Sequence, residues 1–281
     1  MSAVLIDSPV ADGLATAGRP PIGVRALRLA GAGWYCVAVA GQLLFAIYVV
    51  GFYGRTAMQG HPEAWNDVLT PGYVPGDTAG NLVLASHLLF AVAVTVGGLL
   101  QLLPRVRQRW PRFHRWNGRV FIVSALVAAI GGLVMVWTRK TGGDLSQYVG
   151  ISCMAVLIIA FGVLAWRAAL RRRFDAHRRW ALRLFLVANG GWFFRVGLML
   201  WLVANQRPAG FDPKSFTGPF LTFLSFADYL VPLAVLELYF HAQAQRSSRA
   251  QLAMAIGLGT SAVAMAGGVV AAAGLLWLPQ L

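Results

Sequence analysis

Residues 175–195 read Asp-Ala-His-Arg-Arg-Trp-Ala-Leu-Arg-Leu-Phe-Leu-Val-Ala-Asn-Gly-Gly-Trp-Phe-Phe-Arg. A charged cluster leads into mostly apolar residues, and a single arginine, Arg195, then precedes a further apolar run at 196–204. From His177 to Arg195 the chain advances 18 residues, which is roughly 27 Å of helix and close to a bilayer core of about 30 Å. The stretch therefore predicts a membrane-spanning helix with a basic face at one end and a lone charge toward the other.

The same kind of entry occurs earlier, where Arg112-Phe-His-Arg-Trp-Asn-Gly-Arg119 leads into another apolar run. The whole chain of 281 residues is 58% hydrophobic and only 12% charged, whereas soluble domains carry about 25% charged residues. The composition therefore predicts an integral membrane protein with one membrane domain.

Apolar runs of the length that a membrane span needs cover residues 28–52, 80–103, 117–138, 147–168, 178–204, 217–241 and 250–278. We therefore predict an all-α fold, a polytopic bundle of about seven transmembrane helices. Residues 1–27 are rich in Pro and Gly and are expected to form a cytoplasmic tail, and residues 28–281 the membrane domain.

The basic residues divide unevenly between the two ends of the predicted spans. Eighteen lie in the tail, in the 104–116, 169–177 and 242–249 links and in the adjoining helix ends, against five on the other side, which are Arg55, Arg139, Lys140, Arg207 and Lys214. Because basic loops stay in the cytoplasm, we predict a bacterial inner-membrane protein with its N-terminus inside and its C-terminus in the periplasm. The net charge of +14 then reflects topology and contact with anionic lipid headgroups, not nucleic-acid binding.

Four local features carry further expectations. Cys36 and Cys153 lie in apolar runs in opposite halves of the bilayer, so we expect two buried thiols without a disulfide. The 53–79 connection is expected to be a solvated loop, with a lid as the alternative. The glycine pairs are expected to allow close helix packing or to mark kinks; they are Gly97-Gly98, Gly131-Gly132 and Gly190-Gly191. Ala264, Gly268 and Ala272 predict a last helix that serves packing.

Histidines gather at the predicted cytoplasmic boundary, where His114 and His177 share one depth on different helices. Two imidazoles at one depth could ligate a b-type haem, and its iron is the only metal that the sequence suggests. Interfacial anchoring is the favoured alternative, because tryptophans and arginines gather at helix ends in the aromatic belt. The anchors would be Arg115, Trp116, Arg178, Arg179 and Trp180.

A second group of polar residues lies within the apolar runs. Arg195, Asp228 and His87 have similar depth in the outer half, and such residues usually face a partner or a cavity. The structural interpretation is an Arg195–Asp228 ion pair between two helices. The functional interpretation is a polar pocket for a quinone, a lipid headgroup or an anion. No nucleotide loop, metal-binding Cys or His spacing, or nucleophile elbow occurs, so no catalytic residue is assigned and an enzymatic activity stays open.

The chain resembles the domain-of-unknown-function 2306 family of predicted bacterial membrane proteins over residues of about 80–240. The matching features are His87 with Gly97-Gly98, His114-Arg-Trp-Asn-Gly-Arg119, His177-Arg-Arg-Trp180 and Arg195. The resemblance implies a membrane fold and no established activity. His114-Arg-Trp-Asn-Gly118 is also similar to a haem-ligating motif of di-haem b-type cytochromes and ferric-reductase-like domains. The sequence leaves three functional classes open: a membrane protein that binds a small ligand, lipid or quinone, a b-type haem protein in electron transfer, and a transporter.

Overall fold

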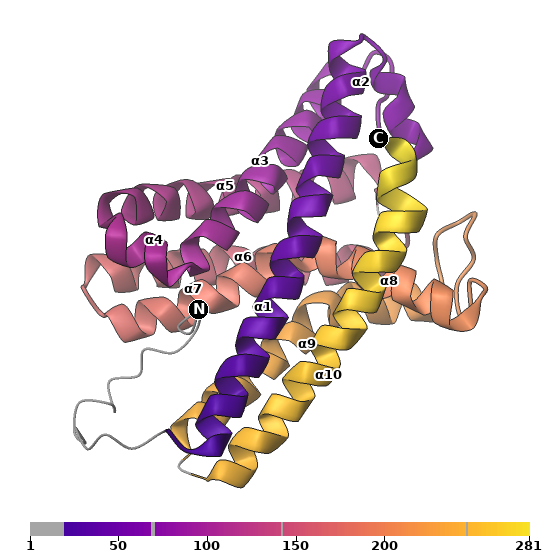
Figure 1. The fold of residues 1–281 in the computed structure, drawn as a ribbon. Helices are drawn as coiled ribbons and strands as arrows, with labels where there is room; N and C mark the ends of the chain where they lie inside the picture. Colours follow the sequence, from indigo (N-terminus) through magenta and orange to yellow (C-terminus); the bar gives the residue numbers. More distant parts are fainter. Residues whose placement is uncertain (1–19, 69–70, 142, 246) are drawn as a thin grey trace.

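A computed structural model describes residues 20–68, 71–141, 143–245 and 247–281 (Figure 1). Its long helices are α1 (Ile22–Tyr48), α3 (Thr78–Leu102), α5 (Pro111–Arg139), α6 (Leu145–Leu170), α7 (Phe174–Ala188), α8 (Gly190–Asn205), α9 (Pro219–Ala244) and α10 (Ser248–Ala272). The shorter elements are the helices α2 (Arg55–Met58) and α4 (Pro104–Arg109), the 3-10 turns η3 (Pro62–Asp67) and η5 (Leu278–Gln280), and the π-helical segments η2 (Val49–Gly54) and η4 (Ala273–Trp277). Within those four ranges there is no β-strand, which confirms the all-α prediction.

Several helix starts follow from local sequence. Asp77 accepts a hydrogen bond from the Gly80 amide at 2.9 Å and caps α3, and Asp144 caps α6 through the Gln147 amide at 3.1 Å. Such caps satisfy backbone donors that have no partner within the helix. Pro111 and Pro219 begin α5 and α9, at the one helical position where proline loses no hydrogen bond.

Six continuous helical segments are long and apolar enough to cross a membrane, and α7 with α8 makes a seventh span if the pair counts as one. The polytopic bundle is thereby confirmed. The first span is longer than predicted at both ends, because it begins at Ile22 and continues through η2 and α2 to Met58. Residues 1–19 of the predicted tail lie outside the described residues.

The direction of the first and last helices supports a count of seven. α1 and α10 pack side by side and run parallel (Figure 1). At their starts, a Cβ on Gly23 would lie 2.8 Å from the Ser248 carbonyl oxygen, and at their ends Arg55 hydrogen-bonds the backbone oxygens of Gln280 and Leu281. Parallel first and last spans require an odd number of crossings, and this is met only if α7 and α8 cross the membrane together.

Small residues let the helices approach closely. A Cβ on Gly268 of α10 would lie 2.6 Å from the Val196 carbonyl oxygen of α8, and one on Gly41 of α1 would lie 2.6 Å from Val269. In a lipid bilayer the hydrophobic effect does not favour contact between helices, so close van der Waals packing of this kind holds them together. The interpretation of the last helix as a packing element therefore fits its contacts.

The three glycine pairs serve different purposes. A Cβ on Gly98 would meet Phe185 at 2.9 Å, so this pair permits close packing. Cβ atoms on Gly131 and Gly132 would lie 3.7 Å from His87 Cβ and 3.6 Å from His87 Cε1, which is ordinary van der Waals contact. Gly190-Gly191 instead follows a break at Asn189, where α7 and α8 are bent by 50°. The side chain of the buried Asn189 donates a hydrogen bond from Nδ2 to the Phe185 carbonyl at 2.7 Å and so stabilises the end of α7.

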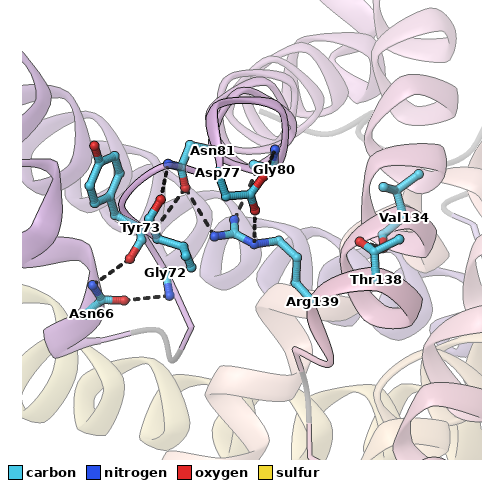
Figure 2. A network of polar contacts seen from close by, with 10 residues as sticks. Asn66, Gly72, Tyr73, Asp77, Gly80, Asn81, Val134, Thr138 and Arg139 are labelled. Carbon is cyan, nitrogen blue, oxygen red and sulfur yellow. Dashed lines mark hydrogen bonds and ion pairs between the residues drawn. The ribbon is translucent and has the colours of Figure 1, made fainter.

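The long connection predicted over residues 53–79 is packed against the bundle in part, since Trp65 and Gly72 are buried, whereas more than half of its described residues are exposed. Figure 2 shows Arg139, at the end of α5, directed at Asp77, the last residue before α3, and at the first turn of α3. Its guanidinium donates to the Gly80 carbonyl and to Asn81 Oδ1, each at 3.1 Å, and lies 3.4 Å from Asp77. Trp65 of η3 is 6% exposed and donates its indole N–H to Thr56 at 2.9 Å.

The cysteines are unpaired, as expected, but they are not buried. Cys36 and Cys153 are free and lie on the outside of the helix bundle. On a lipid-facing surface, a thiol is removed from water without being covered by protein, so the apolar surroundings in the sequence did not imply a place in the core.

Candidate functional site

A cavity of about 330 Å³ lies between α1, α7, α8, α9 and α10. Its wall is almost entirely apolar, with Trp34, Phe193 and Leu258 among its residues. The exposed side chains Phe223 and Val231, 62% and 53% accessible, belong to the same wall. The cavity therefore borders the bundle surface that faces lipid.

Asp228 of α9 is the acidic residue in this wall and is 7% exposed. Its Oδ1 atom is buried and has no hydrogen-bond partner among the described residues. The hydroxyls around the cavity are already engaged, since Tyr35 donates to the Leu99 carbonyl at 2.7 Å, Ser261 donates to the Leu258 carbonyl at 2.9 Å, and Tyr239 accepts from Gln243. One carboxylate oxygen thus remains available to a ligand.

Two backbone features accompany Asp228. Pro232 lines the cavity one turn later, and because proline has no N–H the Asp228 carbonyl lacks its usual helical partner. Gly190, the first residue of α8, lies close to the carboxylate, because a Cβ there would be 3.8 Å from Asp228 Oδ2. The positive end of the α8 dipole therefore faces the acid. The helix break, the proline and the carboxylate meet at one place.

The predicted Arg195–Asp228 ion pair is not formed in the described residues. Arg195 donates to the Gly191 carbonyl at 2.7 Å and lies 5.4 Å from the centre of the Phe45 ring on α1. Asp228 instead faces Gly190 and the cavity. Arg195 and Asp228 therefore have different neighbours. The predicted pocket of His87, Arg195 and Asp228 is not one site but two.

Of the two charged residues, Arg195 is the one that interacts with His87. The His87 Nδ1 atom is 2.9 Å from the Ala128 carbonyl of α5, and the ring packs over Gly131 and Gly132. Arg195 interacts electrostatically with His87 and also with Tyr48 and Tyr53. We call Phe45, Tyr48, Tyr53, His87 and Arg195 the Arg195 cluster. The sequence did not predict that Tyr48 and Tyr53 belong to this group. An apolar run does not reveal in which direction the side chains at the end of α1 and in η2 point.

His114 and His177 interact electrostatically. His177 Nδ1 lies 2.9 Å from the Ala165 carbonyl of α6, and His114 Nδ1 is buried without a hydrogen-bond partner among the described residues. Part of the His114 motif serves packing: Asn117 Nδ2 donates to the Gly97 carbonyl at 2.8 Å and joins α5 to α3.

The expected interfacial anchors differ in their surroundings. Arg115 and Trp116 are exposed, and the Trp116 side chain is 68% accessible, as an anchor requires. Trp180 packs inward against Phe161 of α6, with ring centres 5.6 Å apart. Its neighbours also turn toward the protein, since Arg179 lies over the Phe240 ring at 5.3 Å and Arg178 is partly buried.

Arg183 and Glu237 form an ion pair that the sequence did not suggest. Two guanidinium nitrogens of Arg183 on α7 donate to the two carboxylate oxygens of Glu237 on α9, at 2.7 and 2.8 Å. The guanidinium also lies 4.7 Å from the centre of the Trp180 ring. This bidentate pair joins the helix before the break to the helix that carries Asp228.

A comparison with protein families finds a match to the model described as "Predicted membrane protein (DUF2306)" over residues 84–231, just over half of the chain. The searches of curated proteins and of solved structures gave no significant match. The weaker resemblance to di-haem b-type cytochromes has no support from these comparisons. The matched region runs from α3 to α9 and contains His87, both histidine motifs, Arg195 and Asp228. The chain therefore belongs to the DUF2306 family of predicted membrane proteins.

Proposed function

We propose that this membrane protein binds a small lipid-soluble molecule in the cavity beside Asp228. The observation that carries the proposal is the buried Oδ1 atom of Asp228, which lacks a partner in an otherwise apolar wall. A buried polar group without a hydrogen bond costs about 1–3 kcal/mol, and a charged one costs more. A bound molecule that supplies a donor would remove that cost.

The wall favours a particular chemistry. An apolar body fits the surrounding side chains, and a cavity of about 330 Å³ is within the range of small-molecule sites, about 300–1,000 Å³. The polar end of the ligand is best matched by a hydroxyl, because a hydroxyl donates to a carboxylate and can also accept from a protonated carboxyl group. A quinol or another hydroxyl-bearing lipid meets both conditions, and it can arrive through the bilayer past Phe223 and Val231.

Native mass spectrometry of the protein released from its membrane tests this proposal. We expect a small-molecule adduct on the unaltered protein and at least about tenfold less of it on Asp228→Leu, since the loss of one hydrogen bond to a charged group gives such a factor. Glu237→Gln is the matched control, because it changes an acid on the same helix outside the cavity wall. An equal adduct on Asp228→Leu, or none on the unaltered protein, would contradict the proposal.

A b-type haem held by His114 and His177 is the second candidate. It is supported by the contact of His177 Nδ1 with the Ala165 carbonyl, because a donated hydrogen bond there fixes the ring and leaves Nε2 free for iron. The buried and unpartnered Nδ1 atom of His114 also fits a ligand role.

The haem candidate predicts a Soret absorption band that survives purification from haem-replete cells. His114→Ala and His177→Ala should each abolish it, whereas His61→Ala should not, because His61 is exposed and contacts Glu63 in the opposite loop. A colourless protein, or a band unchanged in both variants, would rule out this pair as the ligands.

A further inference from the structure

The Arg195 cluster is distinct from the cavity, and its central charge lacks a counter-charge. In the part of the chain that the structure describes, Arg195 forms no ion pair, and it donates a hydrogen bond from one nitrogen, Nη1, to the Gly191 carbonyl. It lies ten residues before the end of α8 at Asn205, or roughly 15 Å along the helix. A cation at such a depth is costly, and in membrane proteins it faces a partner or a polar cavity.

Other donors without partners lie near this charge. Gln42, one turn before Phe45 on α1, is fully buried, and both polar atoms of its side chain lack a hydrogen bond among the described residues. The indole nitrogens of Trp192 and Trp277 are also buried and unpartnered. Trp192 precedes Arg195 by three residues on α8, and the Trp277 ring centre lies 5.5 Å from that of Phe45. Three unpartnered N–H groups thus belong to side chains on the same helix as Arg195 or beside its neighbour Phe45.

The backbone conformation beside the Arg195 cluster is also unusual. Both π-helical segments of the described chain flank the cluster: η2 carries Tyr53, and η4 ends at Trp277. Such segments are rare and occur frequently at functional sites. The rings of Tyr48 and Tyr53 pack edge to face with their centres 6.0 Å apart, and Trp65 of η3 packs on Tyr53 with ring centres 5.7 Å apart. The packed connection therefore covers this end of the cluster.

We propose that the Arg195 cluster binds an anionic oxygen group, a carboxylate or a phosphate, with the Arg195 guanidinium as its counter-charge. A guanidinium has five N–H donors arranged for bidentate contact with such groups, and the tyrosine hydroxyls and indole N–H groups can donate to the remaining lone pairs. The group could belong to a free anion from the outer solution or to the headgroup of an anionic lipid, because both present the same oxygens.

Thermal unfolding of the detergent-purified protein tests this inference. Sodium phosphate and sodium acetate are compared with sodium chloride at equal ionic strength, and nanodiscs of phosphatidylglycerol with nanodiscs of phosphatidylcholine. We expect at least one anion-bearing condition to raise the unfolding temperature of the unaltered protein. The rise should be lost in Arg195→Gln and retained in Arg207→Gln, a matched control in the exposed loop after α8. A response to phosphate or acetate would identify a free anion, and a response only to phosphatidylglycerol would identify a lipid.

Two further comparisons show whether a lost response is caused by poor folding of the variant. Removing an uncompensated charge should leave Arg195→Gln at least as stable as the unaltered protein in chloride, and Arg195→Lys should keep part of the anion response. Equal responses in Arg195→Gln and the unaltered protein, or no response in any condition, would overturn the inference.

Discussion

Two opposite charges within the membrane-spanning helices have different surroundings at the scale of single residues. Asp228 lies in a wall of apolar side chains, near the positive end of α8. Arg195 lies among aromatic rings and hydroxyls and contacts the face of Phe45. Cation–π contact contributes about 0.5–2 kcal/mol, which offsets only part of the cost of a buried guanidinium. Each charge is thus left with unused hydrogen-bonding capacity, and each proposal assigns a ligand to one of them.

Double-mutant cycles separate a true ion pair from two independent charges. For Arg183→Ala and Glu237→Ala we expect a coupling energy of roughly 0.5–1 kcal/mol, because the pair is bidentate but half of the Glu237 side chain is exposed. For Arg195→Ala and Asp228→Ala the changes in the free energy of unfolding, of whichever sign, should add within about 0.5 kcal/mol, since the two side chains do not form an ion pair. The free energy of unfolding in a denaturing detergent is the quantity to measure. Partial recovery of stability in the Arg195 and Asp228 double variant would show that the two charges do interact.

The sequence predicts the depth of a residue better than its direction. Counting along a helix placed Arg195, Asp228 and His87 at one level, and two of them do lie together in the Arg195 cluster. The direction of a side chain depends on helix rotation and bending, and the break at Asn189 changes both for every residue of α8. Asp228 could therefore be recognised as an intramembrane acid, whereas its neighbours could not.

At the scale of elements, the break between α7 and α8 organises the site. It places Gly190, the first residue of α8, next to Asp228, and it allows α8 to pack against α10 while α7 packs against α6. The apolar runs were sufficient to predict every span, because length and composition are all that a span requires. The break itself was hidden within one apolar run, since Gly190-Gly191 is compatible with either close packing or a kink.

The Arg183–Glu237 pair and the packed outer connection depend on side chains far apart in sequence. Arg139 binds Gly80 and Asn81 across 59 and 58 positions of the chain. Arg183 and Glu237 are 54 positions apart. Charge counting assigned Arg139 to the outer side and Arg183 to the inner side, but it could not identify their partners, because many acceptors share each level. Contacts of this kind require the arrangement of the helices to be known first.

At the scale of the whole molecule, the parallel course of α1 and α10 (Figure 1) links the count of spans to the location of the site. If α7 and α8 cross the membrane as one broken span, the break, Asp228 and the cavity lie within the bilayer, where a lipid-soluble ligand has access. If the pair instead returned to the side from which it entered, α10 would run antiparallel to α1. The orientation of the ends, with the N-terminus inside, stays a prediction from the basic residues.

Labelling of two single cysteines tests the broken span most directly. In a background with Cys36→Ser and Cys153→Ser, the variants Arg173→Cys and Lys214→Cys place one exposed thiol before α7 and one after α8. A membrane-impermeant maleimide added to intact spheroplasts should label the Lys214→Cys protein at once, and the Arg173→Cys protein only after the membrane is permeabilised. Labelling of both variants, or of neither, before permeabilisation would place the two ends on the same side and would contradict a crossing by α7 and α8.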